Sequence, residues 1–233
     1  MPDLLALDGL TAFYGDFQAL HGIDLSLRQG EVLAVIGANG AGKSTLMRSI
    51  SGLMRNAPGM VRYRGAPIGD LRPDRIAALG IALVPEGRQL FASLTVEENL
   101  MIGARTGRPG PWDLRSVAAL FPVLAERRHQ RPATLSGGQQ QQVAIGRALM
   151  SNPDLLMLDE LSLGLAPVVI RQIYEALPGI VSGGMSAIVV EQDISKALSV
   201  SSRVICLQEG RVSLRGASSE VTRDAISAAY FGI

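Results

Sequence analysis

The nonapeptide GANGAGKST, residues 37–45, constrains the fold of this chain more than any other stretch. It follows the apolar run EVLAVIG at 31–37 and precedes KSTLMRSISGL, which has a helical pattern. A glycine-rich turn between a buried strand and a helix collects backbone N–H groups at the positive end of the helix, where phosphate oxygens bind. The pattern G-x-x-x-x-G-K-[ST] therefore predicts a triphosphate site, with Lys43 on the β- and γ-phosphates and Ser44 on Mg²⁺. The other residues expected to bind the nucleotide in this turn are Gly37, Asn39, Gly40, Gly42 and Thr45.

A second strand supplies acidic groups for the same site. The run LLMLDE at 155–160 is apolar until its last two residues. We expect Asp159 to support the Mg²⁺ from the carboxyl end of this strand. Glu160, one residue further on, is placed to orient or deprotonate the attacking water.

The order of the predicted elements indicates an α/β fold. Strand-like runs at 31–37, 81–85, 155–160 and 187–192 alternate with helical patterns, which is typical of a mainly parallel sheet covered by helices. Further expected strands are one at 61–65 and a closing hairpin around Glu209-Gly210. A helix should begin after the capping box of Thr95 and Glu98, and another at 113–130 should be kinked or split at Pro122. Two more helices are expected, one at 137–150 stopped by Asn152-Pro153 and one from about Val168.

Composition excludes several classes of function. The formal net charge is +1, the pI is about 7.9 and aromatic residues are 4%, so no strong field or stacking surface indicates nucleic acid. We interpret ERRHQR at 126–131 as a solvated helix end, and Cys206, the single cysteine, as a core residue. Two scattered histidines do not form a metal site. The start MPDLLALDGL lacks a signal-peptide pattern and no run approaches the ~18 apolar residues of a membrane span, so we expect a cytosolic, soluble protein.

A second anion site separates the classes of nucleotide-binding protein. The sequence LSGGQ at 135–139 places a serine and two glycines at the start of a helix, where N–H groups are free and the helix dipole favours an anion. A guanine-selecting Asn-Lys-x-Asp pattern is absent from the sequence. Two such helix starts in one chain can each hold a phosphate, or can share one nucleotide between two copies of the chain.

The turn at 37–45, LSGGQQQQVAIGRAL and LLMLDE, in this order and spacing, resemble the ATP-binding subunits of ABC transporters. The resemblance spans essentially the whole chain. It implies a P-loop fold with an N-terminal antiparallel β part, forming a single ATP-binding domain over 1–233. About 1–85 and 152–233 would form the nucleotide-binding core, and about 86–151 a helical subdomain.

The same resemblance implies that two subunits dimerise head to tail, with each ATP between the P-loop of one subunit and the signature of the other. The residues that would contact the γ-phosphate of the partner's ATP are Ser136, Gly137, Gly138 and Gln139. Tyr14, in TAFYGDFQAL, matches the aromatic residue that stacks on adenine.

This chain departs from the family pattern at the hydrolytic site. Gln192 stands where the family has a histidine that contacts the γ-phosphate, and neither His21 nor His129 is expected to substitute for it. A glutamine can donate a hydrogen bond to phosphate but cannot take a proton, and it could instead only cap the strand. Glu86 stands where a glutamine usually senses Mg²⁺ and the membrane partner. Leu161 and Ala166 replace a common proline and aspartate. These departures bear on the turnover rate more than on ATP binding.

Four stretches resemble one subfamily, the second ATP-binding subunit of branched-chain amino acid importers, whose close relatives serve urea and amides. They are VPEGRQLFASLTVEENL, LSLGLAP, VVEQDISKAL and AAYFGI. The implied partners are permease subunits that contact 86–100, a second ATP-binding subunit (identical or not) and, indirectly, a periplasmic substrate-binding protein. The chain would then lie on the inner face of the plasma membrane. Two alternatives are a different cargo and a soluble ABC ATPase of translation or DNA repair, which the single P-loop and the near-zero charge disfavour.

Overall fold

The computed structural model describes residues 3–231, and its centre is a six-stranded sheet in the order β10-β9-β3-β8-β7-β6. Five neighbouring strands run parallel, and β10 pairs antiparallel with β9 at one edge. The strands are β3 (Val32–Ile36), β6 (Ile81–Val84), β7 (Leu155–Asp159), β8 (Ser186–Glu191), β9 (Arg203–Gln208) and β10 (Arg211–Ala217). The predicted mainly parallel core sheet is therefore confirmed.

A second, antiparallel sheet has the order β2-β1-β4-β5. Its strands are β1 (Leu5–Tyr14), β2 (Phe17–Leu27), β4 (Val61–Tyr63) and β5 (Ala66–Pro67). A tight turn at residues 15–16 joins β1 to β2 and places Tyr14 opposite Phe17 at the tip of the hairpin. This sheet is the N-terminal antiparallel part that the resemblance implied.

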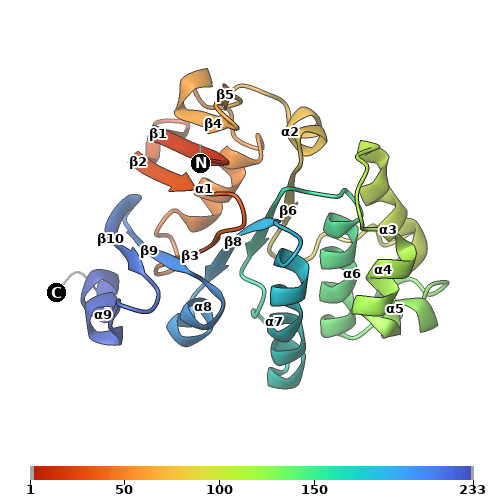
Figure 1. The fold of residues 1–233 in the computed structure, drawn as a ribbon. Helices are drawn as coiled ribbons and strands as arrows, with labels where there is room; N and C mark the ends of the chain where they lie inside the picture. Colours follow the sequence, from red (N-terminus) through yellow and green to blue (C-terminus); the bar gives the residue numbers. More distant parts are fainter. Residues whose placement is uncertain (1–2, 232–233) are drawn as a thin grey trace.

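Helices cover both faces of the parallel sheet, and four of them gather beyond its β6 edge. That group comprises α3 (Val96–Gly103), α4 (Leu114–Leu120), α5 (Pro122–Glu126) and α6 (Gly137–Leu149), and Figure 1 shows it on the side of the molecule away from the antiparallel sheet. The remaining helices are α1 (Lys43–Ile50), α2 (Pro73–Leu79), α7 (Pro167–Val181), α8 (Ile194–Val200) and α9 (Arg223–Phe231). Short 3₁₀ turns lie at Pro58–Met60, Ala104–Thr106 and Pro132–Thr134.

Alternate residues of the parallel strands pack on opposite faces of the sheet. In β7, Leu155 and Met157 join a core beneath the antiparallel sheet and α1, whereas Leu156 and Leu158 join a core with α6 and α7. A third, smaller core lies under α8 and α9. Because both faces are covered, these strands have continuous apolar runs rather than an alternating pattern. No described helix combines the length and the apolar character that a membrane crossing requires.

Most local predictions agree with the observed elements. Thr95 and Glu98 form the predicted capping box of α3, and Pro122 splits the helix predicted at 113–130 into α4 and α5. The strand predicted at 155–160 ends one residue earlier, because the last pair of the ladder joins Asp159 to Val190. The next residue, Glu160, has a left-handed φ of 48°. The short helices α2, α8 and α9 were not predicted. Gly232 and Ile233, at the end of AAYFGI, lie outside the described residues.

Candidate nucleotide-binding site

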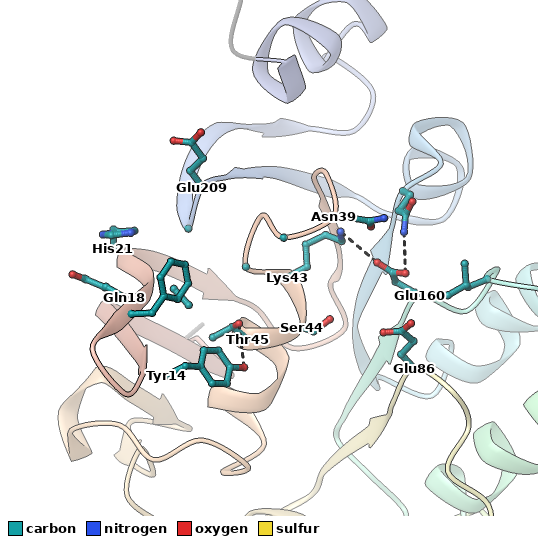
Figure 2. A pocket seen from close by; sticks show the side chains of 17 residues that line it. Tyr14, Gln18, His21, Asn39, Lys43, Ser44, Thr45, Glu86, Glu160 and Glu209 are labelled. Atoms are coloured by element: carbon teal, nitrogen blue, oxygen red, sulfur yellow. Dashed lines mark hydrogen bonds and ion pairs between the residues drawn. The ribbon is translucent and has the colours of Figure 1, made fainter.

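A cavity of about 750 Å³ opens at the carboxyl end of β3, where ligands commonly bind in parallel α/β sheets. Segments that are distant in the sequence line it: the tip of the β1–β2 hairpin, the turn before α1, and residues after β6, β7, β8 and β9. Figure 2 shows Tyr14 and Glu160 on opposite sides of Lys43 in this cavity. The predicted site residues that line it are Tyr14, Asn39, Gly40, Gly42, Lys43, Ser44, Thr45, Glu86, Glu160 and Gln192.

The glycine-rich turn presents the start of α1 to the cavity. Gly42 caps this helix in a left-handed conformation, with φ 102°. A Cβ atom at Gly42 would lie 2.8 Å from Cδ2 of Leu20, so only glycine fits between the turn and β2. The first N–H groups of a helix have no partner within the helix, and Lys43, Ser44 and Thr45 of the first turn of α1 line this cavity. Gly37, at the start of the turn, contributes a carbonyl that Lys43 contacts.

Lys43 and Glu160 form an ion pair at the floor of the cavity. The Lys43 ammonium donates to the carbonyls of Gly37 and Ala38 at 2.9 and 3.0 Å. It lies 3.3 Å from Oε1 of Glu160, and the two side chains are 4% and 10% exposed. Nε2 of Gln192 donates to the other oxygen, Oε2, at 2.9 Å. Each oxygen of the Glu160 carboxylate is therefore held by a different side chain.

The backbone of Glu160 is also constrained, with a left-handed φ of 48°. A positive φ is unfavourable for a residue with a side chain, and such strain tends to persist at functional sites. The Glu160 N–H donates to the carbonyl of Val190 at 3.1 Å, which ties the turn after β7 to the end of β8.

Asp159, the last residue of β7, is a buried carboxylate that lines a neighbouring groove together with Ser44 and Glu86. Its side chain is 6% exposed, and Oδ1 has no hydrogen-bond partner. Burial raises the pKa of this carboxyl to about 6 from an ordinary value of 3.8. The charges of Glu160 and Glu86 also raise this pKa, and a hydrogen bond with Ser44 lowers it. The unpartnered Asp159 oxygen, the Ser44 hydroxyl and the Glu86 carboxylate are oxygen ligands of the kind that Mg²⁺ prefers. The residues present therefore fit this ion.

The side of the cavity formed by the β1–β2 hairpin contains residues that the sequence analysis missed. Tyr14 is 44% exposed, and its hydroxyl lies 3.4 Å from Oγ1 of Thr45 and accepts from Arg48 at 3.1 Å. Phe17, 70% exposed across the hairpin turn, lines the same cavity. An aromatic residue at each end of a two-residue turn was the available signal. The other unpredicted lining residues are Gln18, Ala19, His21, Leu163, Glu209 and Gly210. Figure 2 places His21 beside Gln18, at the end of the cavity opposite Glu160.

The signature residues lie elsewhere. Ser136, Gly138 and Gln139 line a separate cavity of about 570 Å³ with residues of α7 and the α4–α5 junction, and none of them lines the Lys43 cavity. Ser136 caps α6: its hydroxyl accepts from the Gln139 N–H at 3.3 Å, and the Gln139 side chain accepts from the Ser136 N–H at 3.0 Å. Gly137, the first residue of α6, follows directly. A single copy therefore does not bring together the two elements that are predicted to bind phosphate.

Known proteins are similar to this chain in sequence and in fold. The family described as ABC transporter matches residues 20–162. The high-affinity branched-chain amino acid transport ATP-binding protein BraG of Pseudomonas aeruginosa is 42% identical, covering 98% of this chain and all of the relative. The glutamine transport ATP-binding protein GlnQ of Escherichia coli is 35% identical, covering 91% of each chain.

Among solved structures, the dimeric post-hydrolysis state of the ATP-binding cassette MJ0796, bound to ADP and phosphate, superposes with a TM-score of 0.80. It is 28% identical and covers 92% of this chain and 98% of that one. The resemblance read from the motifs is thereby confirmed, since a family match over more than half of the chain agrees with a near full-length relative and with the fold. The chain belongs to the ABC transporter family and has the fold of its ATP-binding cassettes.

Proposed function

We propose that this chain is the ATP-hydrolysing subunit of an importer of branched-chain amino acids. The proposal rests on the group of residues around Lys43. The start of α1, the buried Lys43 ammonium and the Glu160 carboxylate, which Lys43 and Gln192 both contact, share one cavity. This grouping suits a triphosphate better than any other small anion. It combines a glycine-rich turn that can bind phosphate with a carboxylate, Glu160, that can accept a proton from water. The near full-length identity with BraG supports the cargo class.

Each side chain of the cavity has a separate task in this proposal. The Lys43 ammonium binds the β- and γ-phosphates, and the α1 N–H groups bind the remaining oxygens. Glu160 takes a proton from water as the water oxygen bonds to the γ-phosphorus and the bond to the β–γ bridging oxygen breaks. Gln192 holds the Glu160 carboxylate toward that water. Tyr14 and Phe17 offer ring faces to the adenine, a contact that tolerates other bases.

Ser44, Glu86 and Asp159 are the residues that would hold Mg²⁺. The bound ion would supply positive charge to the phosphate oxygens. The unpartnered Oδ1 of Asp159 supports this assignment, because burying that oxygen without a partner is costly.

A second ATP-binding subunit is required to complete the site. Because the signature residues lie in a separate cavity, the γ-phosphate contacts of Ser136, Gly137, Gly138 and Gln139 would be made to the ATP held by the other subunit. The solved cassette dimer with ADP and phosphate supports this arrangement. The second subunit can be another copy or a related chain.

We place the permease contact on the groove between α1, α2 and the helical segment, which we take as a subdomain over about 86–151. This groove has a volume of about 450 Å³ and includes Leu53, Gln89 and Ile102. Leu53 in this groove, and Phe91 and Met101 on the helical segment, are 60%, 48% and 47% exposed, and a contiguous patch of such side chains would suit a protein partner. Glu86 lines both this groove and the Lys43 cavity, so it can report permease contact to the phosphate site. The protein would then bind the inner face of the plasma membrane through its permeases.

The hydrolysis step is tested with Glu160→Gln. We expect this variant to bind ATP at least as tightly as the parent, because a carboxylate no longer competes for Lys43, and to lose nearly all hydrolysis. Nucleotide affinity, phosphate release and the oligomeric state with ATP are measured, and a trapped nucleotide-bound dimer is expected. Hydrolysis at the parent rate would show that Glu160 is not the base.

The cargo is tested by expressing the chain with its operon neighbours and measuring uptake of labelled amino acids. Branched-chain amino acids are expected to accumulate in an ATP-dependent manner, with the periplasmic binding protein present. Uptake of glutamine, urea or amides instead would move the proposal to another cargo. Failure to co-purify with any integral membrane protein, together with salt-dependent binding to DNA or ribosomes, would favour a soluble ABC ATPase.

A further inference from the structure

Behind the hydrolytic site lies a buried carboxylate that the proposed mechanism does not use. Glu191, the last residue of β8, is 1% exposed. Oε2 accepts from the Ser162 hydroxyl at 2.7 Å, and Oε1 accepts from the Ser162 N–H at 3.2 Å and from the Tyr174 hydroxyl. Within residues 3–231, no lysine, arginine or histidine forms an ion pair with it. Three donors therefore carry the stabilisation of this buried charge.

These contacts join the same two segments that meet in the cavity. Gln192 follows Glu191, and Ser162 lies two residues after Glu160, so the link between Ser162 and Glu191 runs beside the link between Glu160 and Gln192. Side chains thus fasten the turn after β7 to the end of β8 at two places, one in the cavity and one in the interior, in addition to the backbone bond from the Glu160 N–H to the Val190 carbonyl.

Apolar packing anchors the two sides of the turn but not its middle. Leu161 is 1% exposed in the core with α6 and α7, and Leu165 packs against that core, whereas Leu163 is 53% exposed and lines the Lys43 cavity. Inside the turn, the N–H groups of Leu163 and Leu165 donate to the carbonyls of Glu160 and Ser162 at 3.2 and 3.3 Å. These local bonds shape the turn but do not fix it to the rest of the protein.

Tyr174 connects the carboxylate to a well-anchored helix. The buried face of α7 comprises Ile170, Ile173, Leu177 and Ile180. Near its start, α7 touches the signature: a Cβ atom at Gly138 would lie 2.4 Å from Cγ1 of Val169. Burial and the neighbouring Glu191 charge raise the pKa of the Tyr174 hydroxyl, so this hydroxyl is protonated and donates to Glu191 at neutral pH.

Building on the proposed ATPase function, we propose that Glu191 is a positioning residue for hydrolysis. With Tyr174 as its anchor, it fixes Ser162, and thereby the turn that carries Glu160, against α7 and β8. Catalytic groups displaced by about 1 Å lose on the order of 100-fold in rate, so loosening this turn lowers the rate without altering the phosphate-binding residues.

The test compares Tyr174→Phe with Tyr63→Phe in the full-length protein and its ATP-binding partner. Both variants remove a tyrosine hydroxyl that donates to a carboxylate, since the Tyr63 hydroxyl donates to Asp154 at 3.0 Å at the opposite end of β7. We expect similar losses of stability in denaturant. Only Tyr174→Phe is expected to lower kcat, by about tenfold or more, with KM for ATP within about twofold of the parent.

Ser162 provides a second comparison. Ser162→Ala removes the donor hydroxyl and is expected to lower kcat, and Ser162→Thr, which keeps a hydroxyl, is expected to restore most of it. Equal kcat values for Tyr174→Phe and Tyr63→Phe in a preparation that hydrolyses ATP would overturn the proposal.

Hydrogen exchange tests the inference independently of hydrolysis. Amides at 160–165 are expected to exchange faster in Tyr174→Phe than in the parent or in Tyr63→Phe. If exchange at 160–165 is unchanged, the positioning role of Glu191 is wrong whatever the rates show. If the parent does not hydrolyse ATP although exchange changes as expected, the proposed function fails while the structural link stands.

Discussion

Replacing Asp159 with asparagine is expected to stabilise the protein in the absence of nucleotide and metal. The Asp159 carboxyl is buried, and its pKa is raised from 3.8 to about 6. A shift of about 2 units, at 1.36 kcal/mol each, corresponds to a penalty of about 3 kcal/mol on the ionised folded form. Asparagine keeps the shape of the side chain and removes the charge. We therefore expect a gain of about 1–3 kcal/mol in the free energy of unfolding at pH 7.5.

The pH dependence follows from the direction of the shift. Between pH 3.8 and about 6 the folded protein holds a proton that the unfolded chain has released, so the parent loses stability as the pH rises through this window. The advantage of Asp159→Asn should be present above about pH 6 and should fade as the pH falls toward 4. Urea unfolding with EDTA at pH 7.5 and 4.5 measures both values.

Asp154 provides the control at the other end of β7. Its carboxylate pairs with Arg108 at 2.7 Å and with Arg64 at 3.0 Å, so Asp154→Asn should destabilise the protein by about 1–3 kcal/mol. The two aspartate variants are expected to have opposite signs. A loss of stability in Asp159→Asn at pH 7.5, or a gain that does not depend on pH, would refute this reasoning.

Three further predictions concern the remaining site residues. Gln192→His should raise kcat for ATP hydrolysis, because an imidazole can contact the γ-phosphate and also carry charge; an unchanged or lower rate would indicate that contact with Glu160 is the main role of Gln192. Gly138→Ala should lower the unfolding midpoint, because its Cβ atom would overlap Val169, and the added change Val169→Ala should restore it in the same urea titration. Tyr14→Phe should bind ATP nearly as tightly as the parent, whereas Tyr14→Ala should lose roughly 1–2 kcal/mol of affinity by titration calorimetry if the ring stacks on adenine.

Local patterns were sufficient to predict much of the fold. The apolar runs at 32–36, 155–159 and 186–191 are buried on both faces, so their sequences indicate parallel strands without knowledge of their neighbours. Caps and prolines placed the start of α3, both ends of α6 and the break between α4 and α5. The seven-residue helices α2 and α8 were missed because two turns give too few apolar positions to establish a period.

The candidate site likewise has parts that the sequence predicts and parts that only the folded structure reveals. The sequence by itself determined the phosphate turn, the acidic end of β7 and the signature, because each is a contiguous stretch whose chemistry follows from its own residues. Only the tertiary structure decided that Gln192 contacts Glu160, that Phe17 joins Tyr14 at the cavity, and that Glu191 is bonded to Ser162 and Tyr174. These contacts join residues from different strands and helices. Their distances depend on how the sheet is ordered and how α7 packs on it, which no local pattern encodes.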